Sequence, residues 1–139
     1  MDPPPNLPFT PLSKPFRDLN RWTAYFREAE IPVLASTAEQ LELWRANEDA
    51  VDANSIGEGL ATDPLMTLKV LRFASAHRSS RLLADAETVT AALVLMGITP
   101  FFKYFGAQPT VEDRLAGLPA AYGGLMRVMR RADRAARLA

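Results

Sequence analysis

The sequence predicts an all-α fold, an irregular bundle of about six to eight helices behind an extended, proline-rich N-terminal leader. Apolar residues recur at helical spacing along most of the chain, and cap residues followed by proline or a capping partner mark several helix starts. No stretch shows the sustained alternation of β-branched residues that a strand requires. The 139 residues, 48% hydrophobic and 23% charged, suit one domain that buries about two-thirds of the unfolded chain's surface.

The leader covers residues 1–15 and contains six prolines. Because proline lacks a backbone N–H and fixes φ, this stretch should be extended and without repetitive hydrogen bonds. A disordered or loosely packed terminus is the simpler interpretation, and a docking peptide is the functional one. Residues 16–139 show no internal repeat and no change in composition, so we expect a single all-α domain there.

The first two helices are predicted on either side of a short break. Proline disfavours helix at the residue before it, so Ile31-Pro32-Val33-Leu34 should interrupt the helical pattern. Thr37, with Gln40 three residues later, predicts a capping box at the start of the second helix. The apolar face of the first helix contains Leu19, Trp22, Phe26 and Ala29, and that of the second contains Leu41 and Trp44.

Two aspartates mark the starts of the next two helices. Asp52 can cap a short helix that Gly57 and Gly59 weaken. Asp63-Pro64 is the sharpest start signal in the chain, because aspartate accepts hydrogen bonds from free amides and proline fits the first helical position. The helix behind it should be central to the core, since much of its circumference is apolar. Its apolar residues are Leu65, Met66, Leu68, Val70, Leu71 and Phe73.

The helical pattern lapses over residues 78–83, where we expect a loop. Asp85 then predicts the start of a helix that runs through Met96 and stops at Gly97. Thr99-Pro100 repeats the combination of cap and proline, and it predicts a short helix rich in aromatic residues.

Arginine dominates the C-terminal part of the chain. Thr110 with Asp113 suggests a short helix, and Gly123-Gly124 should interrupt the chain before a final helix from Leu125. One side of that final helix is apolar and contains Leu125, Val128, Met129, Ala132 and Ala136. The other side is our candidate interaction or phosphate-binding face and contains Arg127, Arg130, Arg131, Arg134 and Arg137. An ordinary solvated surface helix is the simpler interpretation.

The sixteen basic and sixteen acidic side chains cancel, but they are unevenly placed. Residues 28–63 contain nine acids and the single base Arg45, which we interpret as a solvated acidic face and not as an acid/base pair. Zero net charge argues against a nucleic-acid or anionic-membrane binder, so nucleic acid is the weakest candidate partner. No run of eighteen apolar residues is present to span a membrane.

Side chains suited to catalysis or metal binding are scarce. The absence of cysteine excludes disulfides, thiolate catalysis and cysteine-ligated metals, and it fits a cytoplasmic location. The single histidine, His77, has no acidic neighbour and should be a partly exposed residue in the last turn of a helix. We therefore expect no catalytic residue, no cofactor and no bound metal.

Four motifs follow one another along residues 31–105. They are Ile31-Pro32-Val33-Leu34, Leu60-Ala61-Thr62-Asp63-Pro64-Leu65, Leu68-Lys69-Val70-Leu71-Arg72-Phe73-Ala74 and Ala92-Leu93-Val94-Leu95-Met96-Gly97. In order and spacing they resemble the HDOD family, the HD-related output domains of bacterial signalling proteins. The resemblance implies an HD-related helical bundle.

Two features depart from the HDOD pattern. Ser75-Ala76 stands where the family usually has Asn-Ser, and the family's later helices have no counterpart, so we expect the domain to be incomplete at its C-terminus. HDOD domains generally lack the His-Asp dyad of the HD phosphohydrolases, and in this chain Arg78 follows His77.

The resemblance implies a non-catalytic signalling or regulatory module, in agreement with the scarcity of catalytic side chains. Our first hypothesis is an interaction module that acts through protein–protein contacts, with a protein partner or a second copy of the chain. The alternative is a degenerate HD-type phosphohydrolase that retains nucleotide or phosphate binding without catalysis, with the arginine-rich face as its site.

Overall fold

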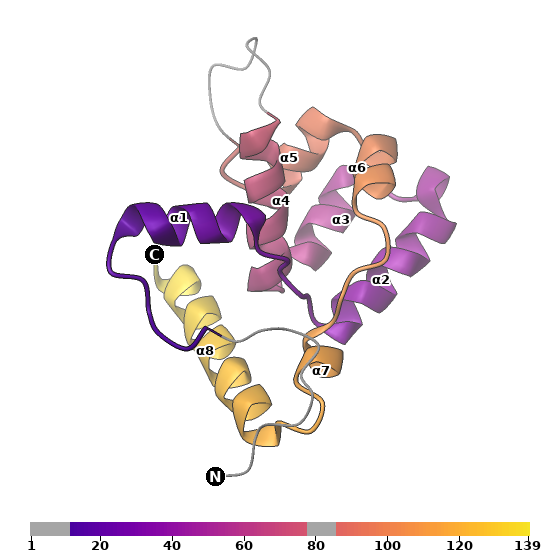
Figure 1. The fold of residues 1–139 in the computed structure, drawn as a ribbon. Coiled ribbons are helices and arrows are strands. Elements are labelled where there is room, and N and C mark those ends of the chain that lie inside the picture. Colours follow the sequence, from indigo (N-terminus) through magenta and orange to yellow (C-terminus); the bar gives the residue numbers. More distant parts are fainter. Residues whose placement is uncertain (1–11, 78–85) are drawn as a thin grey trace.

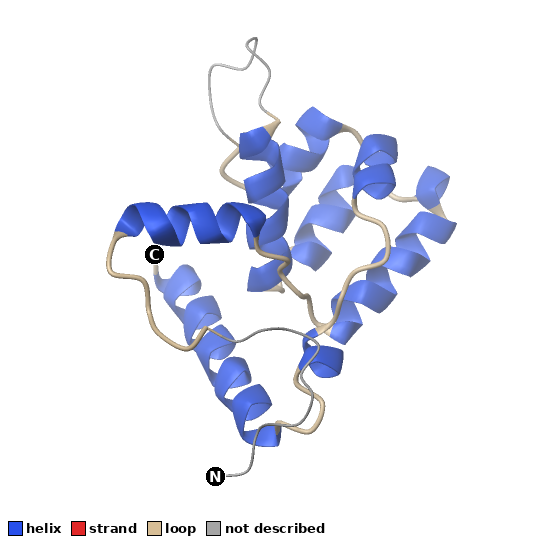
Figure 2. Cartoon of the chain, in the orientation of Figure 1, coloured by secondary structure: helices blue, strands red, loops and turns tan. Residues whose placement is uncertain are grey.

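The chain forms a bundle of helices (Figure 1). The computed structural model describes residues 12–77 and 86–139, and in these residues it contains eight α-helices and one 3-10 helix but no strand (Figure 2). The all-α prediction is therefore confirmed, whereas most of the predicted leader and the predicted loop at 78–83 lie outside the described residues. The elements are α1 (Leu19–Glu28), α2 (Ala35–Ala46), η1 (Glu48–Ala50), α3 (Ala53–Leu60), α4 (Pro64–Ala76), α5 (Val89–Met96), α6 (Ile98–Tyr104), α7 (Val111–Arg114) and α8 (Pro119–Leu138).

The core lies where α2 to α6 meet. Helix α4 packs against α5 and α8, and Figure 1 places it in the middle of the bundle, as its apolar circumference predicted. That circumference is only partly covered, because Leu68 remains 47% exposed. The most deeply buried apolar side chains of the core are Val33, Leu41, Ile56, Leu60, Met66, Val70, Leu93 and Phe101.

Helices α3 and α5 approach each other closely at Gly57. A Cβ atom on this buried glycine would lie 2.0 Å from the Thr90 hydroxyl and 3.0 Å from the Thr90 Cα. Glycine is therefore required at this position for the contact between the two helices, although its intrinsic helix propensity is low.

Asp63 joins the starts of α2 and α4. Its side chain is fully buried, and Oδ1 accepts hydrogen bonds from the backbone N–H groups of Leu65 at 2.9 Å and Met66 at 3.3 Å. Oδ2 accepts from the backbone N–H of Leu34 at 3.0 Å and the hydroxyl of Thr37 at 2.8 Å. The predicted start at Asp63-Pro64 is confirmed, and one carboxylate satisfies donors at two helix starts.

The capping box predicted at Thr37 is wrong. Helix α2 begins two residues earlier, at Ala35, and the buried Thr37 hydroxyl donates to Asp63. The backbone N–H of Ala35 donates to Glu112 Oε2 at 2.8 Å. The free amides at the start of α2 thus find acceptors on residues distant in the sequence, which the local pattern around Gln40 could not reveal.

Two predicted helix starts and one predicted helix stop agree with the structure. The side chain of Asp52 caps α3 by accepting from the Ser55 N–H, and that of Thr110 caps α7 by accepting from the Asp113 N–H. Gly97 ends α5 with φ of 87°, a backbone conformation that favours glycine.

Three predicted helix starts are wrong. Helix α5 begins at Val89 behind the cap Thr88, whereas Asp85 lies outside the described residues. Helix α6 begins at Ile98, so Thr99 lies inside it, because Gly97 ends one helix and begins the next without a loop. Helix α8 begins at Pro119 and runs through Gly123-Gly124. The cost of each glycine, about 1 kcal/mol, is offset by the long run of helix-favouring residues from 125 to 138.

Candidate functional site

The arginine-rich face of α8 is exposed to solvent, as the sequence suggested. Arg137 pairs with Asp133 at 3.0 Å, and no other arginine of this face forms an ion pair within the described residues. The shallow depression on this face has a volume of about 430 Å³. It is lined by Arg127, Arg130, Arg131, Asp133 and Arg134.

The apolar side of α8 is covered only in its first half. Met129 is buried against the bundle, Val128 is half exposed, and every residue from 130 to 139 is exposed. The predicted separation of basic and apolar sides is therefore present, but most of the apolar side has no cover within the described residues.

The acidic segment lies away from α8. Figure 1 shows α2 and α3 on the right of the bundle and α8 on the left, with α4 between them. Exposed carboxylates on the right-hand side include Glu39, Glu42, Asp49, Asp52 and Glu58, in agreement with a solvated acidic face. Asp63 is the exception, since its buried carboxylate has the structural role described above.

His77 follows the last residue of α4 and is exposed, as predicted. Its Nδ1 atom lies 3.0 Å from the carbonyl oxygen of Phe73, and its ring stacks on the Phe73 ring with centroids 4.0 Å apart. Residues 12–77 and 86–139 bring no three histidine or acidic side chains together in an arrangement that could hold a metal ion.

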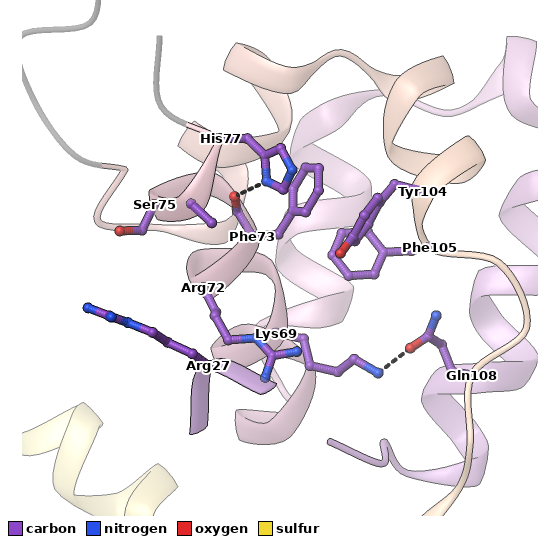
Figure 3. Close-up of a pocket in the computed structure, with 10 residues that line it drawn as sticks. Arg27, Lys69, Arg72, Phe73, Ser75, His77, Tyr104, Phe105 and Gln108 are labelled. Atoms are coloured by element: carbon purple, nitrogen blue, oxygen red, sulfur yellow. Dashed lines mark hydrogen bonds between the residues drawn. The ribbon is translucent and has the colours of Figure 1, made fainter. Parts of the chain in front are cut away.

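A cavity of about 760 Å³ lies between α1, α4 and α6 (Figure 3), and the sequence analysis did not predict it. Four basic side chains line this cationic cavity, and none of the described residues that line it is acidic. The basic residues are Arg27, Lys69, Arg72 and His77, and they are accompanied by Phe73, Ser75, Ala76, Tyr104, Phe105 and Gln108.

Lys69 is the most deeply buried of these basic residues, with 7% of the residue exposed. Its ammonium donates to the carbonyl of Ile31 at 2.7 Å and to the side-chain oxygen of Gln108, and it forms no ion pair among the described residues. Burial lowers the pKa of Lys69 from 10.5 to about 8. Positive charges on Arg72 and Arg114 add to this lowering, while Glu30 and Asp63 oppose it.

Arg72 anchors α1 beside the cavity. Its Nη1 donates to the carbonyl oxygens of Phe26 and Ala29, each at 2.7 Å, and these carbonyls lie at the C-terminal end of α1. A cation at this end also interacts favourably with the helix dipole. The contact brings Arg27, in the last turn of α1, to the cavity wall.

Gln108 reaches the cavity because the chain after α6 runs beside the segment before α2. The backbone N–H of Val33 donates to the carbonyl of Pro109 at 2.9 Å, and that of Val111 donates to the carbonyl of Val33 at 2.8 Å. Three separate segments, α1, α4 with His77, and residues 104–108, therefore build the cavity. The only local signal in the sequence is Lys69, a lysine within a largely apolar helix.

A second, apolar groove of about 530 Å³ lies between α1 and α4. Its lining includes Leu19, which is 79% exposed, together with Trp22, Phe26, Ile31 and Leu68. Helix α1 contributes no buried residue, so its apolar face is open to solvent along this groove.

The chain matches no family model, no curated protein and no solved structure. None of the described helices has the length and apolarity needed to cross a bilayer. The functional conclusions below therefore rest on the residues and their geometry.

Proposed function

We propose that this chain is a cytoplasmic, non-catalytic interaction module of the HDOD type, and that it docks onto a second copy of itself. The observation that supports this proposal is the open apolar face of α1, which forms a groove with α4 although α1 buries none of its residues. Contiguous apolar surface of this kind is typical of protein-interaction sites.

The distribution of charge favours a second copy as the occupant. Basic α8 lies on the same side of the bundle as α1, and the acidic residues of α2 and α3 lie on the other side (Figure 1). The basic side of one copy is thus complementary to the acidic side of another, and the net charge of zero adds no overall repulsion. Such a contact is heterologous, because different surfaces of the two copies meet.

Sedimentation velocity over a range of protein concentrations tests the proposal. The wild-type chain should associate, and Leu19→Gln with Phe26→Gln in the apolar groove should weaken association about tenfold or more. Leu95→Gln is a matched control, because Leu95 is an exposed leucine on α5, outside the groove and outside the acidic side. A wild-type chain that stays monomeric at the highest concentration would overturn the proposal.

A charge-reversal pair tests the orientation of the two copies. One variant combines Arg130→Glu with Arg134→Glu on α8, and the other combines Glu39→Arg with Glu58→Arg on the acidic side. Each variant alone should associate poorly, and a mixture of the two should associate well, because opposite charges again face each other.

A mixing control removes the contribution of net charge. Lys14→Glu with Arg17→Glu changes the net charge by the same amount as the α8 variant but at exposed positions before α1. Mixing this control with the acidic-side variant should leave association weak. Equal recovery of association in both mixtures would contradict the heterologous arrangement, in which α8 of one copy meets the acidic side of the other.

A further inference from the structure

The cationic cavity is chemically distinct from the surfaces that support self-association. We propose that it binds a small molecule carrying both a phosphate group and a flat ring, with the phosphate against Lys69 and Arg72 and the ring beside Tyr104 and His77. The cavity shares Arg27 and Arg72 with the apolar groove, but the proposal does not require self-association, since Lys69, His77 and Tyr104 line the cavity and not the groove.

Lys69 supplies the first argument for an anionic ligand. A buried charge is costly unless an opposite charge pairs with it, and the described partners of Lys69, Ile31 and Gln108, are neutral oxygen atoms. An ammonium has three donors, and two of them are used by these partners. The third remains for an anion in the cavity that Lys69 lines.

Arg72 supplies the second argument. Both of its hydrogen bonds to the end of α1 use Nη1, so its Nε and Nη2 donors have no partner among the described residues. A guanidinium with free donors suits bidentate binding of phosphate. Figure 3 shows the side chains of Lys69 and Arg72 next to each other on the same stretch of α4, while Arg27 comes from α1 with its guanidinium directed away from Lys69.

The aromatic wall supplies the third argument. Tyr104 is 55% exposed and packs against Phe73 with ring centroids 3.7 Å apart, while His77 stacks on Phe73 from α4 (Figure 3). Exposed rings held by such packing offer a stacking surface for a flat ligand ring. The volume of about 760 Å³ lies within the range typical of small-molecule sites.

A phosphate monoester fits this cavity better than a carboxylate does. Two arginines and a lysine line it, none of its described lining residues is acidic, and this excess of positive charge suits a dianion. The ring and the phosphate would contact adjacent walls, since the aromatic side chains and the cations follow each other along α4.

Calorimetric titration of the full chain with three probes tests the proposal. Adenosine monophosphate should bind more tightly than inorganic phosphate, and adenosine should bind most weakly. Arg27→Gln should weaken binding of adenosine monophosphate about tenfold, because a charge-assisted contact is lost. Arg27 is exposed and makes no hydrogen bond through its side chain within the described residues, so this variant should fold normally, as circular dichroism will check.

Further variants locate the phosphate and the ring. Lys69→Met should abolish binding of both phosphate probes, and Tyr104→Leu should weaken binding of adenosine monophosphate but not of inorganic phosphate. Arg130→Gln on α8 is the matched control and should leave all affinities unchanged.

Three outcomes would overturn the proposal. They are the absence of binding by both phosphate probes, equal affinity for adenosine and its monophosphate, and a loss of affinity in Arg130→Gln that Arg27→Gln does not show. The last result would move phosphate binding from the cavity to α8.

Discussion

The bundle from α2 to α6 and the two flanking helices, α1 and α8, are held in place in different ways. Buried side chains from all five helices form the core of the bundle, whereas α1 and α8 together contribute a single buried residue, Met129. Helix α1 is attached largely through the hydrogen bonds of Arg72 to its C-terminal carbonyls. The stability of the chain should therefore depend on the bundle, while its interactions should depend on the flanking helices and on the cationic cavity.

Asp63→Asn should give the largest loss of stability. The buried carboxylate accepts four hydrogen bonds at the starts of α2 and α4, and an asparagine would place an NH₂ group opposite one pair of donors. We expect the free energy of unfolding to fall by about 3 kcal/mol in a urea titration. Asp52→Asn is the control, because asparagine is as good a cap at the exposed start of α3. Similar losses in both variants would show that Asp63 acts only as a local cap.

Gly57→Ala should give the next largest effect. The new methyl group would collide with Thr90, whose backbone Cα lies only 3.0 Å from its position, so α3 and α5 would have to separate. We expect a loss of about 2 kcal/mol in the same titration. Gly106→Ala has open space around the new methyl and should be neutral. An equal response at both glycines would mean that α3 and α5 can shift apart without cost.

Local sequence patterns predicted the fold class and several helix boundaries. They failed where residues distant in the sequence determine the start of a helix. The caps at Asp52, Asp63 and Thr110 lie within three residues of the amides that they bind at the starts of their own helices, so spacing alone could identify them. The start of α2 could not be identified in this way, because Glu112 accepts its Ala35 amide from 77 positions away.

The difference between local and distant contacts also explains why the sequence predicted the arginine face but not the cationic cavity. The arginine face of α8 is a property of one helix and was visible as a spacing of arginines. The cationic cavity combines Arg27, Lys69, Arg72 and Gln108 from different parts of the chain, and only the packing of α1 and of the segment after α6 brings them together.

Lys69 belongs to α4 of the bundle and also lines the cationic cavity. Its burial should make the stability of the chain depend on pH. Its pKa is lowered to about 8 in the folded chain, below the ordinary value of 10.5, so above pH 8 the unfolded chain binds more protons than the folded chain. Stability should therefore rise with pH, by about 1 kcal/mol between pH 7 and pH 9, through this residue.

The difference in stability between wild type and Lys69→Met at each pH measures this contribution. Other charged groups near Lys69 are present in both chains, so their own contributions to stability cancel in this difference. These groups are Glu30, Asp63, Arg72 and Arg114, together with Arg27 and His77 across the cavity. A difference that stays constant from pH 7 to pH 9 would show that the ammonium is well solvated. Saturating phosphate should flatten the slope, because an anion in the cavity raises the pKa of Lys69 again.

Leu19→Gln should have the smallest effect on stability and separates the two regions most directly. Leu19 is exposed on α1, so its replacement should change the free energy of unfolding by no more than about 0.5 kcal/mol. Leu41→Ala in the core should cost about 3 kcal/mol. The same Leu19→Gln variant should weaken self-association in sedimentation velocity, because its side chain lines the apolar groove. If Leu19→Gln lost stability but associated normally, α1 would belong to the stabilising core, and its assigned role in interaction would be wrong.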